Sequence, residues 1–149
     1  MRVVLDTNVV LSAILFGGKP KQVIEAALAG SIHLFASESM ISELRGVLQR
    51  PKFGFSAQHV QGIVSEFAGI TEWIEPKEHF EMMAEDPTDN QFIDCAMAIR
   101  ADYLVTGDCH LLRLGKCGNT QIVNPDSFVG ILAKGKVNRK SSSFTAPPK

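Results

Sequence analysis

The sequence lacks the features that mark an exported or membrane-bound protein. Its apolar runs are far shorter than the roughly 20 residues that a membrane-spanning helix needs, so we predict no transmembrane segment. An aspartate interrupts the first apolar run at position 6, so the start of the chain does not have the pattern of a signal peptide. The 3 cysteines form no Cys-x-x-Cys pair, and we expect free thiols in a reducing compartment. Together these absences predict a cytoplasmic protein.

Acidic residues are missing from the end of the chain, although the formal net charge of −1 neither favours nor excludes a nucleic-acid partner. No acid follows Asp126, whereas basic residues continue at Lys134, Lys136, Arg139, Lys140 and Lys149. Serines and prolines accompany them, and this composition predicts a basic, flexible tail over residues 135–149. Residues 1–134, in a chain that is 45% hydrophobic, are enough for one domain with its own core.

Short apolar runs alternate with helical patterns along the chain. The apolar runs predict strands at residues 2–6, 32–36, 72–75, 103–106 and 121–123. Caps and breakers predict helices between them, from Pro20 to Gly30, Ser37 to Pro51, Ser56 onward, Asp86 to about Arg100, and Asn124 to about Lys134. This alternation predicts an α/β fold with a central parallel sheet and helices on both faces.

Two acidic residues lie where predicted strands end. Asp6 ends the first apolar run, and Asp108 closely follows the strand at residues 103–106. In open parallel sheets, ligands bind in the crevice outside the carboxyl ends of the strands. Both side chains should therefore project into that crevice, although either residue could simply end a strand or form a turn.

Three further acids lie on or beside predicted helices. Glu43 lies about 100° from the centre of an apolar helix face, where it could reach the crevice or stay at the surface. Asp94 has apolar neighbours in its helix, and Asn90 lies one turn earlier on the same side. That stripe is either part of a buried site or a narrow solvent face. Asp89 occupies the capping-box position for Asp86, which explains an acid there without any catalytic role.

Clustered carboxylates have a chemical consequence. Two like charges a few ångströms apart repel by roughly 4 kcal/mol at an intermediate dielectric constant, so such a cluster either takes up protons or binds a cation. Oxygen ligands select hard ions such as Mg²⁺ or Mn²⁺ over zinc. A deprotonated water on such an ion can attack a phosphodiester. The acids therefore indicate a metal-dependent nuclease.

Four segments, in their order along the chain, resemble the PIN-domain nucleases. They are Leu5-Asp6-Thr7-Asn8-Val9, Ser42-Glu43-Leu44, Asp86-Pro87-Thr88-Asp89-Asn90 and Ala101-Asp102-Tyr103-Leu104-Val105-Thr106-Gly107-Asp108. The resemblance covers roughly residues 1–133 and is to the VapC-like toxins of bacterial toxin–antitoxin systems. It implies a three-layer α/β/α fold, a central acidic pocket with Mg²⁺ or Mn²⁺, and cleavage of single-stranded RNA.

The resemblance also implies roles for particular residues. Asp6 would bind the metal directly, and Glu43 would bind it or orient its water. Asp108 would complete the pocket. Asn8 and Thr106 would hold Asp6 and Asp108 in place without binding the metal themselves.

Two departures from the family pattern concern the rest of the site. Many PIN domains carry a third acid at the position of Asn90, so either Asp94 or Asp89 must supply it here. The helical direction and the apolar surroundings of Asp94 favour Asp94, with Asn90 beside it as a supporting group. Where relatives often have another aspartate, this chain has His110, which could make a weak metal contact or face solvent.

The leading hypothesis is a Mg²⁺- or Mn²⁺-dependent endoribonuclease that is the toxin of a toxin–antitoxin pair. A cognate antitoxin and a homodimeric state are implied by the resemblance. Arg45 and Arg100 could bind substrate phosphates or be ordinary solvated charges. The alternative is a catalytically weak PIN module for RNA binding or protein assembly. A receiver-like phosphoacceptor is disfavoured, because Thr7 and Asn8 follow Asp6 where that class needs an acidic pair.

Overall fold

The first apolar run of the sequence forms the centre of a mostly parallel sheet. The structure is a computed structural model, and it describes the backbone of residues 1–80 and 89–145 and, within these, the side chains up to residue 135. In this part of the chain the sheet has the order β3-β2-β1-β4-β6-β5. Its strands are β1 (Arg2–Leu5), β2 (His33–Ala36), β3 (Thr71–Trp73), β4 (Tyr103–Val105), β5 (Lys116–Cys117) and β6 (Thr120–Val123). Neighbouring strands pair in parallel, except that β5 and β6 are antiparallel.

Strand β1 lies between β2 and β4 and is covered on both faces. Val3 and Val4 are completely buried, which explains why this strand is a continuous apolar run and not an alternating one. In the parallel register Leu5 is opposite Val105, so β1 and β4 end at the same level. The residues that follow them, Asp6 and Thr106, therefore leave the sheet next to each other.

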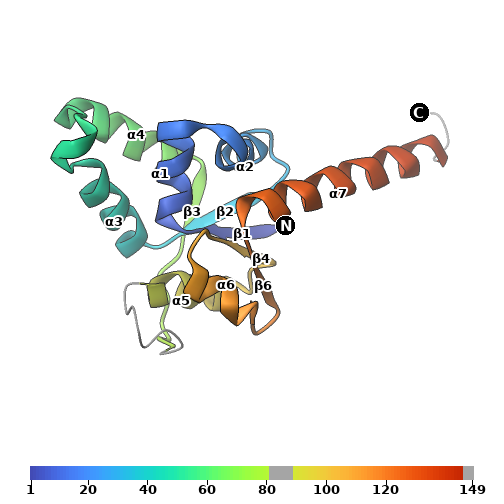
Figure 1. Cartoon of the computed structure of the whole chain (residues 1–149). Coiled ribbons are helices and arrows are strands. Elements are labelled where there is room, and N and C mark those ends of the chain that lie inside the picture. The colour runs from blue at the N-terminus through green and yellow to red at the C-terminus, as the bar shows by residue number, and fades with distance from the viewer. Residues whose placement is uncertain (81–88, 146–149) are drawn as a thin grey trace.

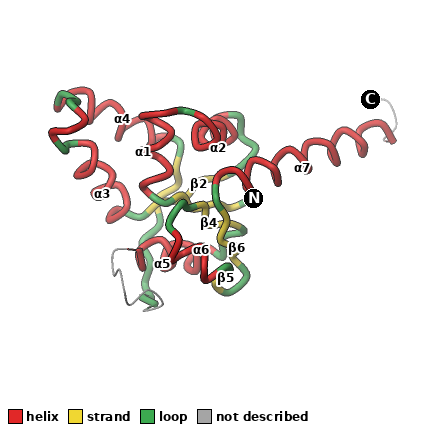
Figure 2. Tube along the Cα trace, in the orientation of Figure 1, coloured by secondary structure: helices red, strands yellow, loops and turns green. Residues whose placement is uncertain are grey.

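Helices cover both faces of the sheet (Figure 1). Helices α5 and α6 pack on one face, against β1, β4 and β6, and α1, α2 and α7 lie on the other, with α3 and α4 beside α1 (Figure 2). The helices are α1 (Thr7–Phe16), α2 (Gly18–Leu28), α3 (Glu38–Leu48), α4 (Ala57–Gly69), α5 (Asn90–Ile99), α6 (Cys109–Leu114) and α7 (Pro125–Thr145), and a short 3-10 turn spans Pro51–Phe53. The predicted α/β fold, a three-layer α/β/α arrangement around a parallel sheet, is confirmed.

Two helix starts follow from serine caps that the sequence displays. Ser37 Oγ accepts a hydrogen bond from the backbone N of Met40 at 3.4 Å, and Ser56 Oγ accepts one from the backbone N of His59 at 3.0 Å. Each bond satisfies an N–H group that has no partner within its own helix. Helices α3 and α4 therefore begin where the sequence predicted.

Helices α1, α6 and α7 differ from the sequence prediction. Helix α1 was not predicted; it begins at Thr7, directly after β1, and the Asp6 side chain caps it by accepting from the backbone N of Asn8 at 2.9 Å. Helix α6 was not predicted, since it is too short to show a helical period. Helix α7 continues to Thr145 and does not end near Lys134; no proline interrupts it before Pro147.

Two other predictions stay predictions. The predicted cap Asp86 lies outside the described residues. The flexibility of residues 135–149 stays a prediction, although the backbone of α7 extends through most of this range and projects away from the sheet (Figure 1).

One hydrophobic core joins the sheet to the helices on both faces. Among its largest completely or almost completely buried side chains are Phe92 and Ile93 of α5, Leu104 of β4, Leu111 of α6 and Phe128 of α7. This core fixes α5 and α6 against the carboxyl ends of β1 and β4, where the predicted site residues lie. Within the described ranges, no helix is both long and apolar enough to cross a membrane.

Candidate metal centre

A hydroxyl group joins the acids that follow β1 and β4. Asp6 is 2% exposed, and its Oδ2 accepts a hydrogen bond from Thr106 Oγ1 at 2.7 Å. The same hydroxyl oxygen accepts a hydrogen bond from the backbone N of Asp108 at 3.0 Å. Thr106 is completely buried, so this hydroxyl fixes both acidic residues at the carboxyl edge of the sheet.

The carboxyl of Asp108 is half-buried and surrounded by donors. Its Oδ1 accepts from the backbone N of His110 at 2.7 Å, as the cap of α6. Burial raises the pKa of Asp108, but hydrogen bonds from the His110 backbone, from Asp89 and from the Leu111 backbone, together with the nearby His110 ring, hold this pKa below its ordinary value. Asp108 is therefore an anion at neutral pH, and the Asp89 carboxyl lies within hydrogen-bonding reach of it.

Asp89 is a buried acid that precedes α5. Its side chain is 7% exposed, and it makes no capping hydrogen bond to its own helix. Its carboxyl instead meets that of Asp108. Two carboxyls in hydrogen-bonding contact cannot both ionise at low cost, so they share a proton or hold a cation.

Glu43 faces the same region from α3. It is half-buried, and its Oε2 accepts a hydrogen bond from Thr7 Oγ1 at 3.5 Å and another from Gln91 Nε2. Thr7 directly follows Asp6, and Gln91 lies in the first turn of α5, just after Asp89. Sequence reasoning missed Gln91, whose signal would have been an amide in a helix that is otherwise mostly apolar.

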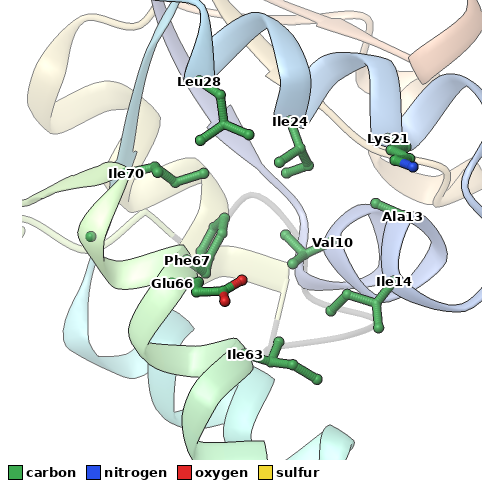
Figure 3. A pocket seen from close by; sticks show the side chains of 11 residues that line it. Val10, Ala13, Ile14, Lys21, Ile24, Leu28, Ile63, Glu66, Phe67 and Ile70 are labelled. Atoms are coloured by element: carbon green, nitrogen blue, oxygen red, sulfur yellow. The ribbon is translucent and has the colours of Figure 1, made fainter. Parts of the chain in front are cut away.

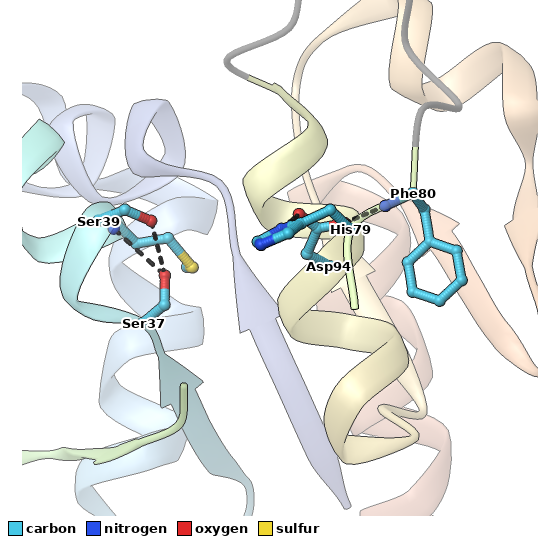
Figure 4. A network of polar contacts seen from close by, with 6 residues as sticks. Ser37, Ser39, His79, Phe80 and Asp94 are labelled. Carbon is cyan, nitrogen blue, oxygen red and sulfur yellow. Dashed lines mark hydrogen bonds and ion pairs between the residues drawn. The ribbon is translucent and has the colours of Figure 1, made fainter. Parts of the chain in front are cut away.

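Asp94 lies in a different environment, although it is on the same helix as Gln91. It is 6% exposed, its Oδ1 accepts from the backbone N of Phe80 at 2.7 Å, and its Oδ2 contacts His79 Nδ1 at 2.9 Å. Figure 4 shows the Asp94 side chain facing His79 and Phe80. In the part of the chain that the structure describes, its hydrogen bonds go to these two residues and none goes to Asp6, Asp89 or Asp108.

The remaining predicted site residues are Asn8, Asn90, Arg45 and Arg100. Asn8 donates its backbone N–H to Asp6 and lines a cavity of about 250 Å³ together with Asp108. Asn90 is half-buried in the first turn of α5, and Arg45 is half-buried on α3. Arg100, the residue that ends α5, lines another cavity, of about 430 Å³, together with Asp94.

A larger and more apolar cavity lies elsewhere on the molecule. It has a volume of about 490 Å³ and is formed by α1, α2 and α4 (Figure 3). Its apolar walls include Val10, Ile24, Leu28 and Phe67. The acids Asp6, Glu43, Asp89 and Asp108 do not line it. Its chemistry suits an apolar surface of a partner and not a phosphodiester.

Comparison with known families identifies the class of protein. The chain matches the PIN domain over residues 2–110, and it therefore belongs to the PIN domain family. PIN domains are generally nucleases, enzymes that hydrolyse phosphodiester bonds, and they generally use divalent metals.

A solved structure has the same fold. It is the crystal structure of VapBC2 from Rickettsia felis bound to a DNA fragment from their promoter. A chain of that structure is 21% identical to this one, with a TM-score of 0.63, and the match covers 83% of this chain and 98% of that chain. Comparison with curated proteins finds no similar sequence.

The carboxylate groups of four acidic residues suit the divalent metals that PIN domains generally use. Asp6, Glu43, Asp89 and Asp108, hereafter the acidic cluster, offer carboxylate oxygens only. The contact between the Asp89 and Asp108 carboxyls favours a cation, which would take the place of a shared proton. Hard divalent ions prefer such oxygen ligands.

Proposed function

We propose that the protein is an endoribonuclease that cleaves single-stranded RNA with Mg²⁺ or Mn²⁺ held by the acidic cluster. The observation that carries this proposal is the contact between the Asp89 and Asp108 carboxyls beside the Asp6–Thr106 hydrogen bond. Two buried or half-buried acids in contact, next to a third, create a site that a divalent cation stabilises. The resemblance to the PIN-domain nucleases is the reason for proposing RNA as the substrate.

Each member of the acidic cluster has a task in this proposal. Asp6, Asp89 and Asp108 would hold the cation, and the Thr106 hydroxyl fixes Asp6 and Asp108 through its hydrogen bonds. When bound, such a cation supplies an activated water and neutralises negative charge on the phosphate. Glu43, which accepts hydrogen bonds from Thr7 and Gln91, would orient that water and accept its proton.

The third acid of the site is Asp89 in this proposal, and not Asp94. Asp89 touches Asp108, whereas both oxygens of Asp94 already accept from His79 and Phe80. Among the described residues the hydrogen bonds of Asp94 go to His79 and Phe80 and to no other carboxyl, so no repulsion between acids favours a cation there. Asp94 thus has a supporting role, in which it ties the chain at residues 79–80 to α5.

The experiment is cleavage of a labelled single-stranded RNA by the purified protein with Mn²⁺, with Mg²⁺ and with a chelator. Asp6→Asn, Asp89→Asn and Asp94→Asn run in parallel, each checked for folding by circular dichroism. The proposal expects metal-dependent cleavage that Asp6→Asn and Asp89→Asn abolish and Asp94→Asn retains. A folded protein that neither cleaves RNA nor binds Mn²⁺ would instead support a catalytically weak module for RNA binding or protein assembly.

We further propose that the protein is the cytoplasmic toxin of a toxin–antitoxin pair and that its antitoxin covers the apolar cavity of α1, α2 and α4. The solved structure that it resembles contains VapBC2, and the cavity is bordered by Leu28, which is 66% exposed. Phe16, at the end of α1, is 82% exposed. An amphipathic helix fits an apolar groove of this kind.

Co-expression with the product of an adjacent gene tests this partner. The expected result is a stable complex that Leu28→Glu disrupts and that Glu25→Gln, an exposed change on the same helix, leaves intact. A complex that survives Leu28→Glu would place the partner elsewhere. The homodimer stays a prediction, and light scattering of the purified protein would measure it.

A further inference from the structure

A second kind of ligand set lies at the first turn of α6. Asp108, Cys109 and His110 each offer one ligand atom, and these three atoms lie within 4.8 Å of one another. In a tetrahedral zinc site, metal–ligand bonds of about 2.0–2.3 Å place neighbouring ligand atoms roughly 3.3–3.6 Å apart. Small side-chain rotations would therefore bring an oxygen, a sulfur and a ring nitrogen to bonding distance from one ion.

These three side chains are accessible from solvent. Cys109 is exposed, and Asp108 and His110 are half-buried. Cys95 and Cys117 are buried, and burial raises the pKa of both thiols, that of Cys95 to about 12 with a contribution from the charge of Asp94. Cys109 is therefore the cysteine of the three that an ion can reach from solvent.

We propose that Asp108, Cys109 and His110 form a binding site for a thiophilic divalent cation such as Zn²⁺ or Co²⁺. Thiolate and imidazole ligands favour these ions over Mg²⁺, whose ligands are oxygens. A water, or the Asp89 carboxyl that contacts Asp108, completes four-coordination. The donors of this site differ from those of the acidic cluster, but the two sites share Asp108.

The shared carboxylate couples the two sites, a consequence that rests on the proposed function, whereas the binding itself does not. An ion held by Cys109 and His110 draws Asp108 away from a hard cation at Asp6 and Asp89. Zinc would then act as an inhibitor of metal-dependent cleavage. The ligand that relatives often supply as a second aspartate is thus replaced here by a pair of softer donors.

The test is titration of the reduced protein with Co²⁺ under anaerobic conditions, read by absorption spectroscopy. The expected result is a thiolate-to-cobalt charge-transfer band that saturates at one equivalent, is displaced by Zn²⁺ and resists a large excess of Mg²⁺. Cys109→Ser should abolish the band, and His110→Ala should weaken Co²⁺ binding by about tenfold or more. A wild-type spectrum with no thiolate band, or one that Cys109→Ser leaves unchanged, overturns the proposal.

Two control variants separate this site from its surroundings. His33→Ala removes another exposed histidine and should leave the band unchanged. Asp6→Asn damages the acidic cluster but leaves Asp108, Cys109 and His110 in place, so the band should remain. If Asp6→Asn abolishes the band while Cys109→Ser does not, Co²⁺ binds in the acidic cluster and the proposed site at Cys109 and His110 is wrong.

A nuclease assay measures the coupling between the two sites. Cleavage with Mn²⁺ is compared with and without one equivalent of Zn²⁺, and the ratio is taken within each variant. The ratio should fall in the wild type and stay near one in Cys109→Ser. If no cleavage occurs at all, the cobalt spectrum still decides whether Cys109 and His110 bind a metal ion.

Discussion

Helix α5 and the residue just before it carry two buried acids with opposite surroundings. Asp89 and Asp94 are 7% and 6% exposed, so burial alone does not distinguish them. Asp89 meets the carboxyl of Asp108, whereas Asp94 accepts hydrogen bonds from His79 and the Phe80 backbone. The two acids therefore differ in the partners of their carboxyls and not in their burial.

The two environments solve the same physical problem in different ways. A buried carboxylate needs donors or a counter-charge, because losing its hydration without them costs several kcal/mol. Asp94 receives donors from the chain itself, and among the described residues its hydrogen bonds go to no other carboxyl. Asp89 lies against the carboxyl of Asp108. When both groups are ionised they repel, and a bound cation would remove this repulsion.

The largest expected difference between the two acids is in activity. Asp89→Asn should lower RNA cleavage by about 100- to 1000-fold, because a charge interaction of about 4 kcal/mol corresponds to nearly three powers of ten in rate. Asp94→Asn should change the rate by about threefold or less. Initial rates with saturating Mn²⁺ measure both. Equal losses in the two variants would erase the distinction between them.

Stability should show the reverse order. Asp94→Ala leaves the Phe80 N–H and the His79 ring without their acceptor and should lower the free energy of unfolding by about 1–3 kcal/mol. Asp89→Ala should change it less in the absence of metal, since Asp108 keeps its hydrogen bonds from the His110 and Leu111 backbone. Urea denaturation gives both values. Asp102→Ala is the matched control, because Asp102 accepts from the Arg2 backbone at an exposed position and its loss should cost less.

Acid titration tests the contact between Asp89 and Asp108. The pKa of Asp108 lies below its ordinary value of 3.8, so this group contributes stability above that pH, which is lost as pH falls through the lower folded-state pKa. Asp89→Ala removes one donor, so the pKa of Asp108 should rise and the loss should begin at higher pH. Carboxyl NMR resonances would show this, with Asp94→Ala as the control that leaves Asp108 unchanged.

The smallest expected effect concerns the thiol next to Asp94. Burial, and then the negative charge of Asp94, raise the pKa of Cys95 to about 12 from 9.0. This thiol favours folding below pH 9.0, and that contribution is lost as pH rises toward about 12. Asp94→Asn should lower the Cys95 pKa while burial keeps it above 9.0. Thiol labelling against pH measures it, and a similar change in Asp89→Asn would contradict the assignment to Asp94.

Much of the fold could be predicted from local patterns. The apolar runs and serine caps gave the strands β1 to β4 and β6 and the starts of α3 and α4, because burial on both faces and capping leave marks in short segments. Helix α1 was missed because Asp6, Thr7 and Asn8 also suit a turn. The length of α7 was underestimated, since composition alone suggested a disordered end.

The site was harder to predict than the fold. Asp6 and Asp108 were placed by the ends of their strands, which a parallel sheet brings to one edge. A helical wheel set Asp94 beside Asn90, but it could not show that His79 and Phe80 return to cover Asp94. Asp89 was obscured by its second explanation as part of a capping box. The contacts that support Asp89 over Asp94 in our proposal join segments that are distant in sequence, and local sequence does not carry them.

Calorimetric titration with Mn²⁺ tests the central claim most directly. Wild type, Asp89→Asn and Asp94→Asn are titrated under identical conditions, after circular dichroism has shown that each is folded. The account predicts that Asp89→Asn weakens Mn²⁺ binding by about tenfold or more, while Asp94→Asn stays within about twofold of the wild type. Tight binding by Asp89→Asn together with lost binding by Asp94→Asn would contradict it and return the third acid to Asp94.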